Sequence, residues 1–206
     1  MALWIGLMSM SIATFIGVLL GALAGYFGDN GLKISRIQII LNILILPLAY
    51  FWAFVKIPLD VLIMRMVEIF NAIPKLLLLL ALIAVVEKPS TTYIIIIIGL
   101  LSWTSITKFV RAELLRIRAL PYIEAARAIG MSEWRIIFAH ALPNALPPVL
   151  ITISFGIASA ILAESSLSFL GLGLPIDTVT WGSMLEKARE YYPAWWLAFF
   201  PGLMLA

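Results

Sequence analysis

Long apolar runs separated by short polar stretches dominate the sequence and predict membrane-spanning helices. A helix needs about 20 mostly apolar residues to cross a bilayer. Apolar runs of about that length or more occupy 3–27, 61–86, 89–107 and 141–163, and a further run begins at 191 and continues to 206. The pattern therefore predicts an all-α fold, a polytopic transmembrane helix bundle.

The segment 37–55 is equally apolar, but basic residues flank both of its ends. These residues are Lys33, Arg36, Lys56 and Arg65. Because Lys and Arg favour the cytoplasmic side of a membrane, a single crossing here would reverse the orientation of every later span. We therefore expect a re-entrant or interfacial element, with a true span as the alternative.

Composition agrees with a membrane protein. Hydrophobic residues make up 63% of the chain and charged residues 12%, and the mean hydropathy is +1.08, whereas soluble domains carry about 25% charged residues. The net charge of +3 is small and scattered, which argues against nucleic-acid binding. With no cysteine and one histidine, the chain cannot form disulfides or a histidine-based metal cluster. We expect no metal and no cofactor in this chain.

The connection between the third and fourth apolar runs carries most of the basic residues. They are Lys108, Arg111, Arg116, Arg118, Arg127 and Arg135. The connections predicted on the opposite side hold Lys88 in one case and Lys187 with Arg189 in the other. The positive-inside rule places the 108–140 connection in the cytoplasm.

Three glycines recur at every fourth position of the first run: Gly17, Gly21 and Gly25. They line one face of the predicted helix with no side chains, which lets another helix approach closely in lipid. We predict that Gly21 packs against a neighbouring helix rather than lipid, and that this face assists assembly with a partner subunit.

Two charged positions inside apolar runs are candidates for a transport pathway or a helix contact. Lys75 follows Pro74, which we expect to kink the second run, and a charge at the bilayer centre costs roughly 2.5–3.5 kcal/mol unless it reaches water or a partner. Earlier in that run, Arg65 and Glu68 are three residues apart and can pair on one helix face.

The second position is Glu164, which follows the fourth run. We expect Pro143, Pro147 and Pro148 to break the start of that run. Glu164, with Ser165 beside it, either marks the outer mouth of a pathway or ends the helix, capped by Ser165 and Ser166.

The stretch 121–148 is a charged, helix-prone island in this apolar chain. Gly130 interrupts its helical pattern, and Ser132 can cap a second helix. We predict two short helices joined by a glycine turn at the membrane surface, with Ala125, Ala126 and Ala128 on a slim exposed side. An ordinary basic loop that adheres to anionic lipid is the alternative.

The EAA motif at 124–126, followed by Gly130 and the Leu-Pro step at 142–143, resembles the EAA loop of ABC-importer permeases, which docks onto the ATPase subunit. The stretch AESSLSFLGLG at 163–173 resembles the block after the fifth helix in the dipeptide, oligopeptide and nickel branch. The resemblance implies a type I importer permease fold and the ATPase-docking residues Glu124, Ala125, Ala126, Arg127, Gly130, Ser132 and Arg135.

The same resemblance implies one transmembrane permease domain over 1–206, with a cytoplasmic coupling loop at 108–143. Compared with the family, 30–58 looks like an insertion, and the first helix and the end of the last are missing. The expected partners are a second permease subunit, two cytoplasmic ABC ATPases and an extracytoplasmic substrate-binding protein, in a bacterial inner membrane.

The expected function is that of a permease subunit in an ATP-driven importer, for di- or oligopeptides. The sequence has no GxxxxGK[ST] phosphate loop, so ATP hydrolysis is expected in the partner chains, and this chain is expected to have no catalytic residues. A membrane scaffold or assembly protein is the alternative. An intramembrane hydrolase using His140 is disfavoured, since no Ser or Asp lies at a spacing typical of a dyad. Peptides, nickel complexes and other substrates stay open, as does a homo- or heterodimeric pore.

Overall fold

The computed structural model describes residues 1–27, 59–86, 90–174 and 178–206. The described chain is helical, with no strand in these ranges, which confirms the predicted all-α fold. The helices are α1 (Ala2–Phe27), α4 (Leu59–Ala72), α5 (Lys75–Ala84), α6 (Thr91–Ile117), α7 (Pro121–Ala128), α8 (Glu133–Ile136), a π-turn η1 (Ile137–Ala141), α9 (Leu142–Phe169), α10 (Trp181–Glu190) and α11 (Trp196–Leu205).

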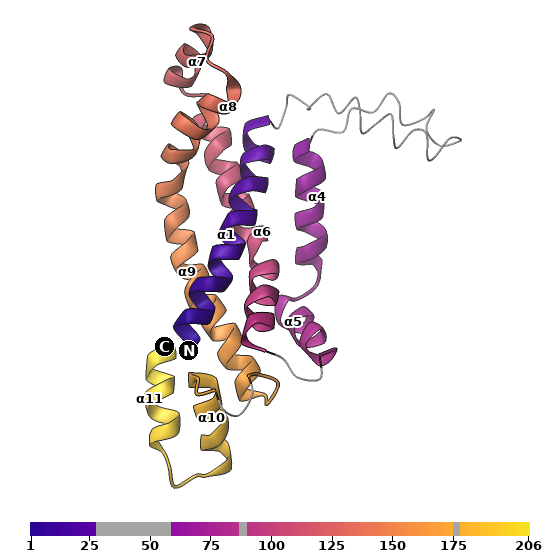
Figure 1. Ribbon diagram of the computed structural model, residues 1–206, viewed down its shortest axis with the longest axis vertical. Helices are drawn as coiled ribbons and strands as arrows, with labels where there is room; N and C mark the ends of the chain where they lie inside the picture. Colours follow the sequence, from indigo (N-terminus) through magenta and orange to yellow (C-terminus); the bar gives the residue numbers. More distant parts are fainter. Residues whose placement is uncertain (28–58, 87–89, 175–177) are drawn as a thin grey trace, which may run out of the picture.

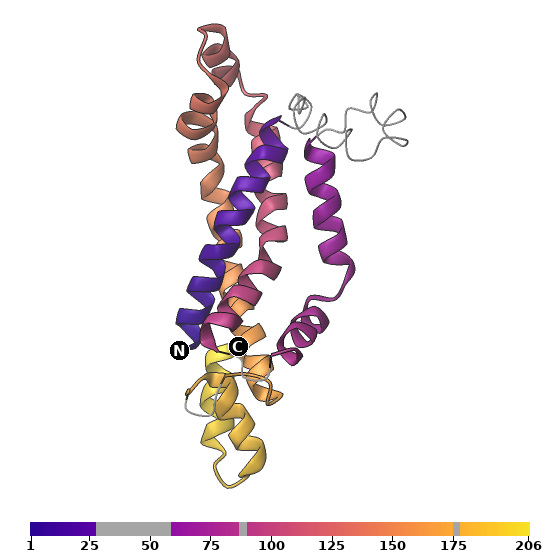
Figure 2. The same cartoon turned by 45° about the vertical axis from the view of Figure 1, so that its right-hand side comes forward.

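Three long helices form the centre of the bundle and are apolar and long enough to cross a membrane. They are α1, α6 and the continuous 37-residue helix Glu133–Phe169 that joins α8, η1 and α9. α4 and α5 add a fourth span if the bent pair is counted as one. Figures 1 and 2 show α1 lying along α6 and α9, with α4 on the far side of α6 from α9.

The glycine face of α1 is in close contact with α6. A Cβ atom on Gly17 would lie 2.6 Å from Ile106 Cβ, and one on Gly21 would lie 2.7 Å from Val110 Cβ. One on Gly25 would lie 2.7 Å from the carbonyl oxygen of Arg111. The neighbouring helix is thus part of the same chain, whereas we had predicted a face that assists assembly with a partner subunit.

The second apolar run forms two helices rather than one kinked span. The axes of α4 and α5 differ by 76°, with Pro74 as the residue before α5. Proline lacks an N–H and clashes with the preceding turn, so the helix stops at Ala72 and restarts at Lys75. The predicted pair forms on α4, where Arg65 Nη1 donates to Glu68 Oε2 at 2.6 Å.

The start of α4 is held to α6 by an ion pair that lies partly buried. Arg111 Nε and Nη2 donate to Asp60 Oδ1 and Oδ2, both at 2.5 Å. The last turns of α1 lie against the same arginine, through Gly25. Phe27 and Leu59 therefore lie at the same end of the bundle (Figure 1). The segment 37–55 and the predicted insertion 30–58 lie outside the described residues.

The prolines at the start of α9 do not break it, contrary to our expectation. Pro143 occupies the first turn of α9, while Pro147 and Pro148 lie inside the helix. The five-residue π-turn η1 ends two residues before Pro143, and Asn144 Nδ2 donates to the carbonyl oxygen of His140 at 2.6 Å. The π-turn changes the helical winding just before the first of these prolines.

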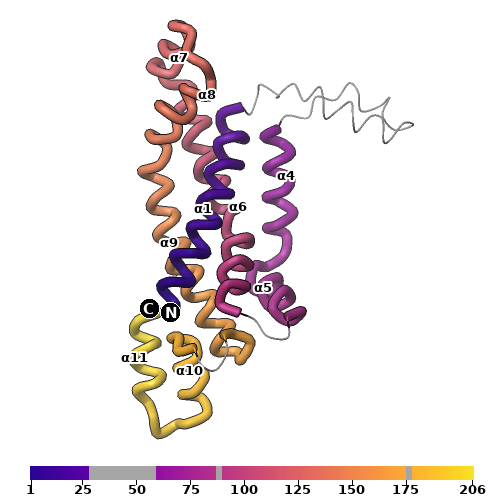
Figure 3. The backbone as a smooth tube through the Cα atoms, in the orientation of Figure 1, coloured from indigo at the N-terminus to yellow at the C-terminus, as the bar shows by residue number. Residues whose placement is uncertain are grey.

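The C-terminal region forms a helical hairpin at the end of the bundle opposite α7 (Figure 3). α10 was not predicted. It begins at a capping box in which Thr180 and Ser183 each accept a hydrogen bond from the other's backbone N–H. The last apolar run was expected to start a span at 191, but α11 begins at Trp196, after Pro193, and has 10 residues.

Candidate functional site

The two helices α7 and α8 lie beyond the cytoplasm-facing end predicted for the bundle (Figure 1). Pro121 occupies the first turn of α7, where its missing N–H has no helical partner in any case. Ile123 and Ala126, three residues apart, are buried against the rest of the chain, with exposed fractions of 0% and 8%. Glu124 and Ala125 are exposed. Ala126 was one of the three alanines predicted on the slim exposed side of this helix. It faces inward instead and cannot contact a partner.

Gly130 makes the turn between the two helices, as predicted. Its φ is +81°, a left-handed conformation that L side chains rarely adopt. The N–H of Gly130 donates to Arg127 O at 2.9 Å and that of Met131 donates to Ala126 O at 3.1 Å. These two bonds form a Schellman motif, which closes the end of α7. A Cβ on Gly130 would have no heavy atom within 4 Å, so the backbone angle alone calls for glycine.

Ser132 stands at the N-cap position of α8, but its side chain accepts no hydrogen bond from that helix. The prediction that this hydroxyl caps the second helix is wrong. Ser132 is exposed, so water can satisfy the free N–H groups of the first turn. Arg135 is also exposed on α8.

A three-residue polar cluster joins this pair of helices to the end of α1. The hydroxyl of Tyr26 donates to Glu133 Oε2, and Arg127 Nη2 donates to that hydroxyl at 3.2 Å. Arg127 Nε also donates to Glu133 Oε1 at 3.2 Å, and its guanidinium lies 5.5 Å from the centre of the Tyr26 ring. The two residues on α7 and α8 thus bind each other and α1. We call Tyr26, Arg127 and Glu133 the α1 clasp.

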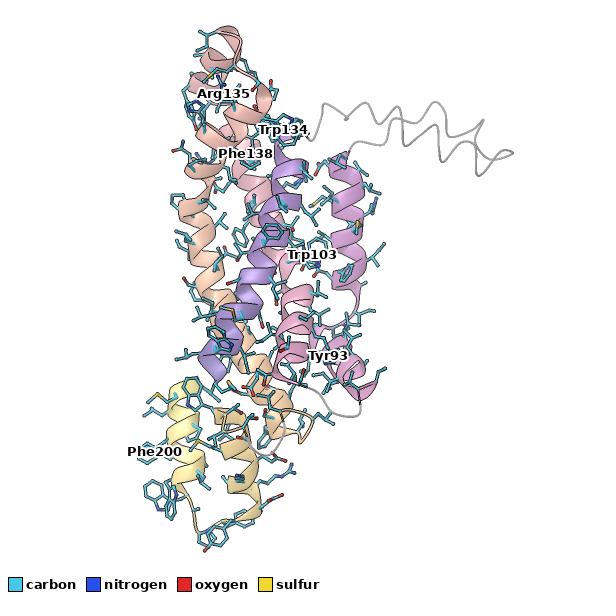
Figure 4. All side chains as sticks on the ribbon, viewed as in Figure 1. Tyr93, Trp103, Trp134, Arg135, Phe138 and Phe200 are labelled. Carbon is cyan, nitrogen blue, oxygen red and sulfur yellow. The ribbon has the colours of Figure 1, made fainter. Side chains whose placement is uncertain are left out.

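Aromatic rings extend the α1 clasp along α8 and η1. The ring of Phe27 lies 5.6 Å from that of Trp134, which stacks on Phe138 at 6.1 Å. Figure 4 shows Trp134 and Phe138 together beside the end of α1. Since such pairs stabilise contacts beyond the area they bury, α8 is fixed to α1 on two sides.

The outer surface of α7 and its turn remains open. Ile129 is 78% exposed and Tyr122 is 42% exposed, and Glu124, Ala125 and Ala128 are exposed beside them. An apolar centre with charged residues around it is the usual composition of a protein-docking surface. In the described residues no group of three or more His, Cys, Asp or Glu side chains could hold a metal ion.

The pathway candidates lie elsewhere. Lys75 is the first residue of α5, and its Nζ donates to Ser102 Oγ on α6 at 2.8 Å. Glu164 and Ser165 are buried inside α9, which continues to Phe169, so Glu164 does not end the helix. Glu164 Oε1 accepts a hydrogen bond from Ser168 at 2.8 Å, whereas Ser166 donates to Leu162 O. The alternative in which Glu164 ends the helix, capped by Ser165 and Ser166, is therefore wrong.

Sequence reasoning missed Tyr26, Glu133 and Trp134 as members of the site. Tyr26 and Arg127 are 101 residues apart, and a single sequence contains no signal that links them. The burial of Ala126 could have been predicted, because Ile123 and Ala126 are three residues apart and so lie on the same face of a helix.

We predict that Tyr26→Phe, which keeps the ring and removes the hydroxyl, loosens α7 and α8. A hydrogen bond contributes about 0.5–1.5 kcal/mol to stability, which corresponds to about 2- to 10-fold in an opening equilibrium. Hydrogen–deuterium exchange in α7 and α8 should be faster by that factor. Tyr192→Phe is the control, because Tyr192 is 82% exposed. Unchanged exchange in the Tyr26 variant would show that the hydroxyl does not hold these helices.

The three helices that are long and apolar enough to cross a membrane define the class of the chain as a helical membrane protein. The family described as "binding-protein-dependent transport system inner membrane component" matches residues 45–206. The chain belongs to this family, whose members are transport components and not enzymes.

Curated relatives with similar sequences are peptide-transport permeases. The chain is 32% identical to the dipeptide transport system permease protein DppC of Alkalihalophilus pseudofirmus, over 100% of this chain and 58% of that protein. It is 32% identical to the di/tripeptide transport system permease protein DppC of Pseudomonas aeruginosa, again over 100% of this chain and 58% of that protein. It is 34% identical to the peptidoglycan transport system permease protein YejE of Agrobacterium fabrum, over 94% of this chain and 44% of that protein. The chain thus spans about half the length of the curated relatives it matches.

A solved structure has the same fold. A chain of the inward-facing MetNI methionine ABC transporter superposes with a TM-score of 0.66 at 18% identity, over 98% of this chain and 85% of that one. The agreement confirms the expected type of permease fold.

Proposed function

We propose that this chain is the membrane-spanning permease subunit of an ATP-driven importer for di- or oligopeptides. The observation that carries the proposal is the α7–α8 pair, which presents an open docking surface on one side and is joined to α1 by the α1 clasp on the other. The peptide-transport relatives support the substrate class.

Movement at the docking surface would reach all three central helices. α7 follows α6 after a short link, α8 continues through η1 into α9, and the α1 clasp attaches both to α1. A partner that displaces α7 therefore displaces α1, α6 and α9 together. Such rigid-body movement of packed helices can open a pathway to one side and then the other.

The proposed partners are two cytoplasmic ABC ATPases at α7–α8, a second permease subunit and an extracytoplasmic substrate-binding protein. The proposed location is a bacterial inner membrane, with several passes. The family description and the relatives support both proposals, and the basic residues near α7 support a cytoplasmic position for this end.

Glu124→Lys tests the docking surface, because it reverses an exposed charge on α7 without a change in buried contacts. We expect the assembled transporter, in proteoliposomes, to lose at least about tenfold in ATP-driven dipeptide uptake, since like charges that face each other across an interface cost several kcal/mol. The amount of inserted protein should not change.

Glu190→Lys is the matched control, as an exposed acidic residue on α10 at the opposite end of the bundle. Normal uptake by the Glu124 variant would rule out this docking surface. A wild-type assembly that binds the ATPases but transports no peptide would instead favour the scaffold alternative.

A further inference from the structure

A small polar cavity lies at the break between α4 and α5, on the side of the bundle away from α7. Its volume is about 170 Å³, and its polar lining consists of Asn71, Lys75, Thr104 and Ser105. Complete small-molecule sites measure roughly 300–1,000 Å³, so this cavity suits one end group of a ligand rather than a whole peptide.

The lining offers hydrogen-bond donors. Lys75 Nζ uses one of its three N–H groups on Ser102 Oγ, whose own hydroxyl donates to Ile98 O at 2.6 Å. Thr104 Oγ1 donates to Asn71 Oδ1 at 3.1 Å. This hydrogen bond uses the amide oxygen of Asn71 and does not involve its amide N–H groups. An ammonium and an amide NH₂ together favour an acceptor that carries negative charge.

No acidic residue lines the cavity. Among the described residues, ion pairs join carboxylates to Arg65, Arg111, Arg116 and Arg127, and none of these pairs involves Lys75. An ammonium group at membrane depth is costly unless it meets water or a counter-charge, and such residues commonly mark a substrate pathway. The counter-charge that the cavity lacks can therefore come from the substrate.

Packed side chains support the cavity on the side of α6. Phe70 packs edge-to-face on Trp103 at 5.4 Å, and Leu79 and Ile83 are the buried residues of α5. Tyr93 OH also donates to Leu82 O at 3.1 Å. Figure 4 shows Trp103 and Tyr93 on α6, along the faces of α4 and α5.

We propose that this cavity is a subsite that binds the terminal carboxylate of the transported peptide, through Lys75 and Asn71. The proposal rests on the proposed peptide-import function and adds a specific chemical requirement, a free carboxylate. A single flexible ammonium suits a subsite that must also release its ligand.

The first experiment measures the charge preference of the cavity. The chain has no cysteine, so Ser105→Cys provides a single thiol on the cavity wall. Each labelling rate is divided by the rate of the same reagent with a small thiol in solution, because the anionic thiolate reacts intrinsically faster with a cationic reagent. On that scale, in the assembled transporter, anionic sulfonatoethyl methanethiosulfonate should label this thiol about tenfold faster than the cationic trimethylammonium analogue, because of the nearby positive charge. Adding Lys75→Met should remove the preference, and adding Lys75→Arg should keep it. Thr92→Cys, about 15 Å along α6 from Ser102, is the control position and should show no Lys75-dependent preference.

The second experiment identifies the ligand. Without the binding protein, millimolar dialanine should slow labelling at Cys-substituted position 105, and dialaninamide, which has no free carboxylate, should not. The protection should disappear with Lys75→Met. Equal labelling by the two reagents would show that Lys75 is already neutralised, for example by a carboxylate of the second permease, and would overturn the proposal. Equal protection by the two dipeptides would overturn it as well.

Failure of the subsite and failure of the importer can be told apart. Wild-type uptake of dialanine tests the importer, whereas the labelling preference tests the cavity. Uptake without a charge preference rejects the subsite alone. A charge preference in a transporter that takes up no peptide rejects the peptide carboxylate as ligand, together with the importer.

Discussion

Gly21→Leu is expected to prevent α1 from packing against α6 and to reduce the yield of folded protein sharply. Even a Cβ at this position would lie 2.7 Å from Val110 Cβ and 2.8 Å from the backbone oxygen of Thr107. Backbone atoms cannot move aside as a flexible side chain can, so the two helices must separate. Overpacking of a core commonly costs about 1–3 kcal/mol, and separation of α1 from α6 also disturbs the contacts of Gly17 and Gly25.

The measurement is the thermal unfolding midpoint and the monodisperse fraction of the purified chain in detergent. Gly202→Leu is the matched control, because a Cβ on Gly202 would have no heavy atom within 4 Å. Insertion into the membrane should persist in both variants, since leucine favours insertion. A Gly21→Leu variant with the wild-type midpoint would falsify the α1–α6 contact.

Gly130→Pro is expected to abolish coupling while the bundle still folds. Proline fixes φ near −65°, whereas Gly130 has a φ of +81°. Proline also removes the N–H that donates to Arg127 O at 2.9 Å. The end of α7 must then rearrange, and the outer surface of α7 loses its fixed relation to the α1 clasp. We expect ATP-driven dipeptide uptake to fall at least about tenfold, together with the stimulation of ATPase activity by the binding protein.

The control substitution is Gly130→Asn, because asparagine adopts the left-handed conformation more readily than other L residues. This variant should retain most of its uptake. Gly130→Ala should lie between the two, since a left-handed alanine costs roughly 1–2 kcal/mol. If the proline variant transported as well as the asparagine variant, the turn would have no part in coupling.

The long helices and the glycine turn could be predicted because each follows from a local rule. The bilayer requires long apolar runs, which defined α1, α6 and α9, and Gly130 interrupts a charged helical pattern. Pro74 correctly predicted a disturbed helix. The angle of 76° between α4 and α5 could not be predicted, because it depends on how α5 packs on α6.

The contacts between distant segments could not be predicted from one sequence. The α1 clasp joins residues from three elements, and the partner of Gly21 depended on which helix lies beside α1. A helix end was one of the two alternatives for Glu164, but α9 continues past it to Phe169 and α10 contacts α9, so its burial is a tertiary effect. The start of α11 was predictable in hindsight, since a proline disfavours the helical conformation of the residue before it, here Tyr192.

The π-turn Ile137–Ala141 sets the rotational phase between α8 and α9. One extra residue in a helical turn offsets the two flanking segments by about 100°, the rotation of one α-helical residue. In an unbroken α-helix, Glu133 and Val149 would lie about 160° apart around the axis, and the π-turn reduces this angle to about 60°. The helix can therefore direct Glu133 to the end of α1 and Val149 into the core from neighbouring faces. The π-turn thus brings both residues toward the side of the helix that faces the rest of the bundle.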